Sequence, residues 1–322
     1  MSALATTLPL QTSHMFNRPG FHIGDTWYFV QGERAHMYYL TCPDSIPRHT
    51  RWSIGHAWSD DLVHWQDMGV VLKPGLPDAW DGICPATGSV IEFGGRYWMA
   101  YTGNFSGPRP ATGLAVSEDL FSWQKWDGNP VTGIDGRIYS GEGNLAWRQP
   151  RWRDPFLFRD GETVYQLITA ALPCAPPETA GTVALACSRD MENWEILPPL
   201  DLPEIGQDLE CPKLHLVDGR YYLTLSVSKT IMAPGLASLQ GEGQPLDTAY
   251  SLVSDNFEGP YVLHGNGRVL EEGFPVSPYA CEPVRFRGKY HLLGTLWDDE
   301  QGDRVCDPIP LQATSRGWKA AR

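Results

Sequence analysis

The sequence predicts an all-β protein, a five-bladed β-propeller that uses residues 1–322 as a single domain. Two observations lead to this prediction. A hairpin-like pattern recurs five times along the chain, and a short strand that ends in serine follows each copy. The composition agrees, because 33 glycines and 27 prolines spread over the whole length favour many short strands and turns over long helices.

The first element of the repeat is a hairpin. Each copy joins two apolar strands through a glycine-containing turn, the usual connection between antiparallel neighbours. The clearest copy reads DPFLFRDGETVYQLIT, from residue 154. The five copies begin at Asp25, Thr87, Asp154, Cys211 and Cys281.

The second element is a short strand followed by a polar turn and usually a tryptophan, as in HAWSDDLVHW. Its serines recur every 58–71 residues, at Ser59, Ser117, Ser188, Ser254 and Ser315. A repeat of this length holds three or four strands, which is the size of a propeller blade. An irregular β-sandwich with coincidental turns is the alternative, and it leaves the fixed order of the two elements unexplained.

The charge and the cysteines narrow the class of protein. The net charge is −13 and there is no run of Lys and Arg, so we expect no nucleic-acid partner. Neither a signal peptide nor an apolar stretch of about 18 residues is recognisable, so we expect no membrane partner. The seven cysteines are scattered without a C-x-x-C motif, which predicts reduced thiols, a cytoplasmic location and no metal or other cofactor.

Carboxylates stand at the predicted start of four inner strands. The innermost strand of each propeller blade lines the central channel, so its first residues converge on the axis. Glycoside hydrolysis needs such a gathering of acids, one to attack or activate and one with a raised pKa to protonate the leaving oxygen. We therefore predict a sugar-cleaving site, although Asp25 could be a turn residue and Asp154 an ion-pair partner of Arg153. The four acids are Asp25, Asp154, Glu210 and Glu282.

Three motifs carry a family resemblance. They are WSIGHAWSDDLVHW (52–65), WRDP (152–155) and ECP (210–212). They are similar to the W-G-H-A-x-S-x-D-L-V-H-W segment, the R-D-P motif and the E-C motif of glycoside hydrolase family 32. This family contains β-fructofuranosidases, invertases, inulinases and levanases, and its catalytic domain is a five-bladed propeller. The resemblance covers about residues 15–300.

The resemblance implies a role for each acid. Asp25, eleven residues before His36, matches the nucleophile, and Glu210 matches the acid/base. Asp154 matches the transition-state stabiliser that binds fructose hydroxyls, and we expect Arg153 beside it to keep it ionised by lowering its pKa. The implied reaction retains configuration on sucrose, fructo-oligosaccharides or fructans, with water or a sugar hydroxyl as acceptor.

Departures from the family pattern leave the substrate open. FHIGDTWYF lacks the family's Asn and Pro around the nucleophile, and CPATGSV (84–90) replaces its F-S-G-S-A segment, with Thr87 or Ser89 as stand-ins. Trp52 and Glu282 are further candidates for sugar contact, with core packing as the alternative for Trp52 and a structural acid as the alternative for Glu282. We expect no trailing β-sandwich, which would leave a surface for a partner subunit in a homo-oligomer. A propeller glycosidase acting on arabinosides and a non-catalytic sugar-binding propeller are the alternatives.

Overall fold

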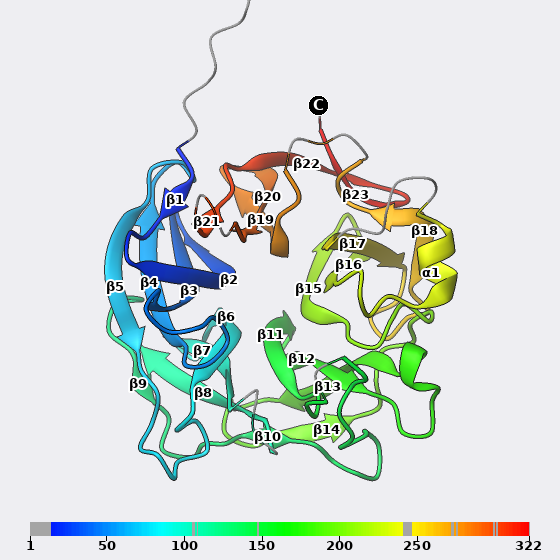
Figure 1. Ribbon diagram of the computed structural model, residues 1–322, viewed down its shortest axis with the longest axis horizontal. Helices are drawn as coiled ribbons and strands as arrows, with labels where there is room; N and C mark the ends of the chain where they lie inside the picture. The colour runs from blue at the N-terminus through cyan, green and yellow to red at the C-terminus, as the bar shows by residue number, and fades with distance from the viewer. Residues whose placement is uncertain are drawn as a thin grey trace, which may run out of the picture.

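The computed structural model describes residues 14–321 except 105–106, 108, 147, 241–246, 272–273, 275, 299 and 301. Five antiparallel sheets stand around a central axis as the blades of a propeller, which confirms the predicted fold class (Figure 1). The chain colour passes once around the ring, so each blade is built from one continuous stretch of sequence, with one exception at the N-terminus.

Blades one to three follow each other without crossovers. Blade one contains β2 (Phe21–Gln31), β3 (Arg34–Pro43), β4 (Ser53–Ser59) and β5 (Gln66–Leu72). Blade two contains β6 (Pro85–Phe93), β7 (Arg96–Gly103), β8 (Ala111–Ser117), β9 (Gln124–Lys125) and β10 (Thr132–Gly133). Blade three contains β11 (Arg153–Asp160), β12 (Thr163–Ala171), β13 (Gly181–Ser188) and β14 (Glu195–Leu197), with the 3-10 helix η1 (Pro177–Thr179) in a loop.

The last two blades complete the ring. Blade four contains β15 (Glu210–Val217), β16 (Arg220–Val227), β17 (Thr248–Ser254) and β18 (Val262–Arg268), and the short helix α1 (Pro234–Ser238) follows β16. Blade five contains β19 (Tyr279–Phe286), β20 (Lys289–Leu296), β21 (Arg304–Val305), β22 (Ile309–Thr314) and β23 (Gly317–Ala320). Among the described residues, no helix has the length and apolar character that crossing a bilayer requires.

The N-terminal strand belongs to the last blade. β1 (Phe16–Asn17) pairs with β21, in the register Phe16 to Val305 and Asn17 to Arg304. The chain then crosses to blade one and begins β2. This pairing joins the first described residues to the last blade and closes the ring between blades five and one.

The predicted serine elements form nearly identical turns in blades one to three, which we call the serine turns (59–65, 117–123 and 188–194). In the second of them, Asp119 Oδ1 accepts hydrogen bonds from the backbone amides of Phe121 and Ser122, at 2.8 and 2.7 Å. The indole of Trp123 donates to the carbonyl of Leu120 at 3.2 Å. Blade five differs, because the hydroxyl that accepts the turn amide belongs to Thr314 rather than to the predicted Ser315.

Apolar side chains fill the space between neighbouring blades. Trp27 and Trp52 of blade one pack in one cluster with Tyr101 of blade two. Leu167 of blade three packs with Leu214 of blade four. Because these buried apolar side chains pack blade against blade, the inner strands are held at fixed positions around the axis, and side chains at their ends can be placed reproducibly.

Candidate active site

The inner strand of every blade carries a bulge at the same place. The pairing of β2, β6, β11, β15 and β19 with the next strand shifts by one residue near the start of the strand. In blades three to five one residue of the bulge has a left-handed backbone, with φ of 58° at Asp154, 50° at Cys211 and 49° at Ala280. Such strain in non-glycine residues is typical of functional sites, and the bulges turn the nearby side chains toward the axis.

A cavity of about 390 Å³ opens at these bulges. Its volume falls within the range of small-molecule binding sites. Asp25, Asp154 and Glu210, the three predicted catalytic residues, all line it. Three of the four residues predicted to bind substrate, namely Arg153, Trp52 and Thr87, line it as well. The structure therefore brings together side chains from blades one to four that are up to 185 positions apart in the sequence.

Asp25 presents one free carboxylate oxygen to the cavity. Its Oδ2 accepts hydrogen bonds from the Thr87 hydroxyl and, at 3.6 Å, from the Cys211 thiol. Within the described part of the chain, no group donates to Oδ1. Burial raises the pKa of Asp25, the nearby Glu210 raises it further, and the hydrogen bond from Thr87 opposes both. The adjacent Gly24 is required here, because a Cβ at this position would lie 2.9 Å from the Cβ of Leu40.

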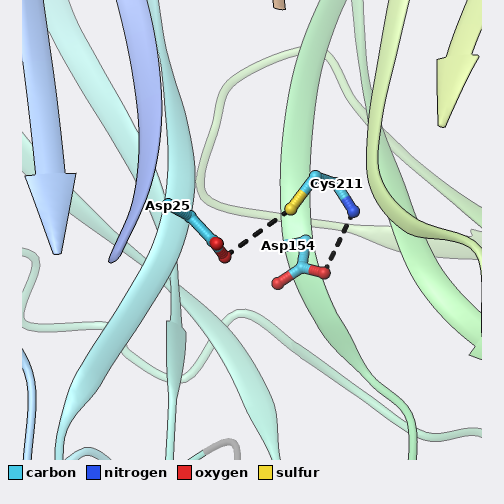
Figure 2. Close-up of side chains that lie close together, drawn as sticks. All are labelled: Asp25, Asp154 and Cys211. Atoms are coloured by element: carbon cyan, nitrogen blue, oxygen red, sulfur yellow. Dashed lines mark hydrogen bonds between the residues drawn. The ribbon is translucent and has the colours of Figure 1, made fainter. Parts of the chain in front are cut away.

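Asp154 is held in the same manner. The Thr169 hydroxyl and the Cys211 backbone amide both donate to its Oδ2 at 3.1 Å, and Figure 2 shows the second of these bonds. No described residue donates to Oδ1, which leaves this oxygen able to accept hydrogen bonds from a ligand. Burial raises the pKa of Asp154 to about 6, and the Arg153 guanidinium only partly offsets this effect.

Arg153 lowers the pKa of Asp154, as expected from the sequence. Burial raises this pKa by more, however, so the net shift is upward. The geometry explains why. Arg153 Nη2 contacts Asp208 and, at 2.7 Å, Glu210, whereas its Nε lies 3.7 Å from Asp154 Oδ2. The guanidinium is shared among three carboxylates, and Asp154 is the most distant of them.

Glu210 accepts a hydrogen bond on each oxygen. Arg153 donates to Oε1, and the Tyr279 hydroxyl donates to Oε2. Burial raises the pKa of Glu210, with Arg153 opposing and with Asp208 and Asp154 adding to the rise. A carboxyl group with a raised pKa retains its proton at higher pH than usual, as a general acid requires.

Cys211 lies between the two aspartates. Figure 2 shows its thiol directed to Asp25 and its backbone amide directed to Asp154. One ligand-type atom from each of these three residues lies within 4.8 Å of the others, so the spacing alone would admit a metal ion. Binding through sulfur needs a thiolate, but burial and the neighbouring carboxylates raise the pKa of Cys211 well above its ordinary value. The geometry suits a protonated thiol that donates to Asp25.

Glu282, predicted to contact substrate, is not among the residues that line the cavity. Regular pairing of β19 resumes at Glu282, directly after the bulge, and the Glu282 carboxylate forms an ion pair with Lys213 at 3.2 Å. The position directly before the bulge, which holds Arg153 in blade three and Glu210 in blade four, holds Tyr279 in blade five. Aligning PVSPYA (275–280) with QPRWRD (149–154) and GQDLEC (206–211) would have identified Tyr279.

Aromatic side chains line one wall of the cavity. Trp52 borders it but is only 1% exposed, because its ring packs beneath Gly24. Trp297 is 39% exposed. Its ring centroid lies 5.2 Å from that of Tyr279 and 5.9 Å from that of His49, and the His49 ring is perpendicular to it. Burial lowers the pKa of His49, so this imidazole is neutral near pH 7. Trp297 and His49 therefore offer an apolar face and an uncharged polar group beside the acids.

Asp208 is the main feature that the sequence did not predict. It is fully buried and accepts hydrogen bonds from Arg153 and from Asn144, the latter at 2.9 Å. Arg151 lies 3.5 Å from its other oxygen. Asp208 thus anchors the arginine that contacts Glu210. The only sequence signal was a second acid two positions before the E-C motif.

The fold and the site define a five-bladed β-propeller with one buried and two half-buried carboxylates in one axial cavity. Residues 26–280 match the model of the glycosyl hydrolases family 32 N-terminal domain. This match covers most of the chain, so the protein belongs to glycosyl hydrolase family 32. The matched region contains Asp154 and Glu210 and begins one residue after Asp25.

The chain shows only moderate sequence identity to individual proteins. The chain is 26% identical to a sucrose-6-phosphate hydrolase of Escherichia coli, over 63% of this chain and 40% of that protein. It is 36% identical to a levansucrase of Rahnella aquatilis, over 54% of this chain and 35% of that protein. The matches thus span about two fifths of the relatives' length. The structure of an inulosucrase from Halalkalicoccus jeotgali bound to kestose superimposes with a TM-score of 0.70 and 22% identity, covering 94% of this chain and 87% of the other, which shows a common fold.

Proposed function

We propose that this protein is a retaining glycoside hydrolase that cleaves β-fructofuranosides. One observation carries the proposal: Asp25, Asp154 and Glu210 share one axial cavity, and the two aspartates each keep an oxygen free of hydrogen bonds from described residues. The membership in family 32 supports it, as do relatives named sucrose-6-phosphate hydrolase, levansucrase and fructosyltransferase.

In the first step, Asp25 Oδ1 attacks the anomeric carbon of the fructosyl group. Hydrogen bonds from Thr87 and Cys211 to Oδ2 hold the carboxylate in place and stabilise its charge. Glu210 gives its proton to the leaving oxygen as the glycosidic bond breaks, so no free alkoxide forms. The product of this step is a fructosyl ester on Asp25.

In the second step, Glu210 is ionised and removes a proton from the acceptor. The acceptor oxygen attacks the same anomeric carbon and releases Asp25, and two inversions give net retention. Water as acceptor gives hydrolysis, and a sugar hydroxyl gives fructosyl transfer. Both are included in the proposal because the relatives carry names of both kinds.

Asp154 acts on the fructosyl ring without forming a bond to it. Its Oδ1 accepts hydrogen bonds from ring hydroxyls, and its negative charge stabilises the positive charge that develops at the anomeric carbon. This role needs the ionised form, which a pKa of about 6 allows at neutral pH.

The substrate class is sucrose, fructo-oligosaccharides or fructans. Product analysis by chromatography on sucrose, inulin, levan and a nitrophenyl arabinoside tests the assignment, with the Glu210→Gln variant as control. We expect free fructose, or fructosyl products, from at least one fructoside and none from the arabinoside. Release from the arabinoside alone would point to an arabinosidase, and tight sugar binding without turnover would point to a non-catalytic propeller.

We also infer a reducing location such as the cytoplasm. No disulfide is recorded among the described residues, and five of the seven cysteines are buried. Protein chains that fold in oxidising compartments commonly use their cysteines in disulfides. The single-domain organisation and a homo-oligomer stay predictions.

A further inference from the structure

The residues that line the cavity come from two kinds of segment. The starts of the inner strands carry the three acids Asp25, Asp154 and Glu210. Loops at the same end of the blades contribute five further residues, which we call the loop wall: His49, Gln149, Ser228, Asp247 and Trp297. The proposed reaction places the fructosyl group beside the three acids, so we expect the leaving group of the first step to contact the loop wall.

Two contacts connect Glu210 with Trp297. Because Glu210 is the residue proposed to protonate the leaving oxygen, the leaving group lies on its side of the cavity. Tyr279 donates a hydrogen bond to Glu210 Oε2, and the Tyr279 ring centroid lies 5.2 Å from that of Trp297. The Trp297 indole donates to the carbonyl oxygen of Ile23 at 3.2 Å, and its 39% exposure leaves an apolar face for the C–H groups of a sugar.

Asp247 lies at the end of blade four that carries Glu210. It directly precedes β17, whose first residue, Thr248, pairs with Val227 of β16. Ser226, the neighbour of Val227, pairs with Glu210 at the start of β15. The register therefore places Asp247 on the side of the cavity where the leaving group is expected.

The Asp247 carboxylate is held in place and keeps one oxygen for a ligand. Its Oδ1 accepts a hydrogen bond from the backbone amide of Lys229 at 2.7 Å. Its carbonyl oxygen accepts one from the Ser277 hydroxyl at 3.0 Å, which ties Asp247 to the segment that leads into blade five. No described residue donates to Oδ2. Since Asp247 is half-buried and lines the cavity, Oδ2 can accept hydrogen bonds from sugar hydroxyls.

The charges of the lining residues favour an uncharged ligand. Arg153 is the single Lys or Arg among them, and it already contacts Asp208 and Glu210. A phosphate group carries a charge of about −1.5 to −2 at pH 7, so near the loop wall it would meet the carboxylate of Asp247. Four carboxylates line the cavity: Asp25, Asp154, Glu210 and Asp247.

The basic residues nearest to the loop wall in the sequence do not change this balance. Arg51, Arg148 and Lys229 are exposed and are not among the lining residues. Arg48, which precedes His49, forms an ion pair with Asp303 at 2.8 Å. Apart from Arg322, every Lys and Arg of the chain lies within the described residues.

We propose that Trp297 and Asp247 form the binding site for the leaving sugar, and that Asp247 selects an uncharged sugar over a phosphorylated one. The inference rests on the proposed function, because it concerns the leaving group of that reaction. Trp297 packs against one face of the sugar and Asp247 accepts its hydroxyls, whereas Asp247 repels a phosphate. In this selectivity the chain differs from its relatives named sucrose-6-phosphate hydrolase.

The first test compares kcat/KM for sucrose and for sucrose 6-phosphate, which carries its phosphate on the glucosyl unit. The wild type should favour sucrose by at least about 10²-fold, because like charges placed together oppose binding. Asp247→Asn keeps an oxygen that accepts hydroxyls but removes the charge, so the ratio should fall by about tenfold. Asp255→Asn is the matched control: it removes an acid that pairs with Arg220 at the other end of β17, and the ratio should not change.

The second test uses methyl β-fructofuranoside, whose leaving group is methanol and is too small to contact the loop wall. Trp297→Ala should lower kcat/KM for sucrose by about tenfold and leave the value for the methyl fructoside within about twofold of the wild type. Trp297→Phe keeps an aromatic face and should retain most of the activity on sucrose. A purely structural role of Trp297 would lower both activities equally.

Three results would overturn the inference while the proposed function stands. They are a wild type that cleaves sucrose 6-phosphate as well as sucrose, an unchanged ratio in Asp247→Asn, and an equal loss on both substrates in Trp297→Ala. Thermal unfolding of each variant shows whether the propeller is intact. If the wild type cleaves no fructoside, the methyl fructoside included, the proposed function falls instead, so the two failures can be told apart.

Discussion

The acids of the serine turns and the acids of the axis belong to the same repeats but behave in opposite ways. Asp119 and Asp190 lie on the surface, where backbone amides donate to them, and these hydrogen bonds lower their pKa, to about 2 for Asp190. Asp25, Asp154 and Glu210 lie in the cavity, where burial raises the pKa of each. The identity of an acidic residue therefore does not determine its pKa in this protein, because its surroundings do.

The difference follows from where in the blade each acid lies. A serine turn offers several amides to one carboxylate and leaves it in contact with water, so it stays ionised and holds the turn together. The axis offers each acid two or three donors, brings several other acids close to it, and leaves it far less solvated than an acid at the surface. The repeated structure thus uses carboxylates for stability at its perimeter and collects them for reactivity at its centre.

The largest effect is expected from Asp25→Asn. The amide cannot attack the anomeric carbon, so kcat should fall by at least about 10³-fold, while the unfolding temperature stays close to that of the wild type. Azide should restore part of the turnover by replacing the missing nucleophile. Near-normal turnover in a folded variant would contradict the assignment of the nucleophile.

Asp154→Asn should have the next largest effect. The variant loses a negative charge beside the developing positive charge, and kcat should fall by roughly 10²- to 10³-fold. Azide should not restore activity, since the nucleophile is still present. Rescue by azide would show that Asp154, rather than Asp25 or Glu210, takes part in the covalent chemistry.

The pH dependence should distinguish the two groups of acids. Because burial raises the pKa of Asp154 to about 6, kcat/KM should fall as the pH drops through this value, by up to about tenfold per pH unit. The contribution of Asp154 to the free energy of unfolding should change with pH in the direction opposite to kcat/KM. Between about pH 4 and 6 the native state binds more protons than the unfolded chain, so stability decreases as the pH rises. Parallel changes in activity and stability across this window would contradict the raised pKa.

Asp190→Ala should have the smallest effect, and on stability only. The variant loses the hydrogen bonds that the backbone amides of Glu192 and Asn193 donate to the Asp190 carboxylate. Its free energy of unfolding at pH 7 should therefore be about 1 kcal/mol lower than that of the wild type. Because the pKa of Asp190 is lowered, this difference should disappear as the pH falls from about 4 through about 2. Denaturant unfolding measures the change, and an unaltered kcat/KM serves as the control.

The repeats in the sequence were sufficient to predict the fold. The hairpins and serine turns recur in the same order, and these local patterns became the strands and turns of the blades. The detail that failed was in blade five, where Thr314 takes the place expected for Ser315. There, β22 is followed by a tight turn into β23 and not by the longer serine turn, so the spacing of the other blades does not apply.

The site was predicted in part. The spacing of the R-D-P and E-C motifs located Asp154 and Glu210, and the structure brings both to the cavity with Asp25. Glu282 was misplaced because the position before the bulge of β19 is held by Tyr279, while Glu282 follows the bulge and pairs with Lys213 away from the residues that line the cavity. Asp208 and Tyr279 were missed because their importance comes from contacts with Arg153 and Glu210 in other parts of the chain, and a single sequence does not display such contacts.

The pairing of β1 with β21 has a consequence for how the site would come apart. A linear array of repeats can fray from its ends one unit at a time, whereas a closed ring has no free end and tends to unfold as a unit. Here the closure lies between blade five, which carries Tyr279, and blade one, which carries Asp25. Opening the ring at this joint would separate Asp25 from Tyr279 and leave Asp154 and Glu210 on adjacent blades. Loss of the two-residue strand Phe16–Asn17 should therefore reduce turnover before it abolishes sugar binding.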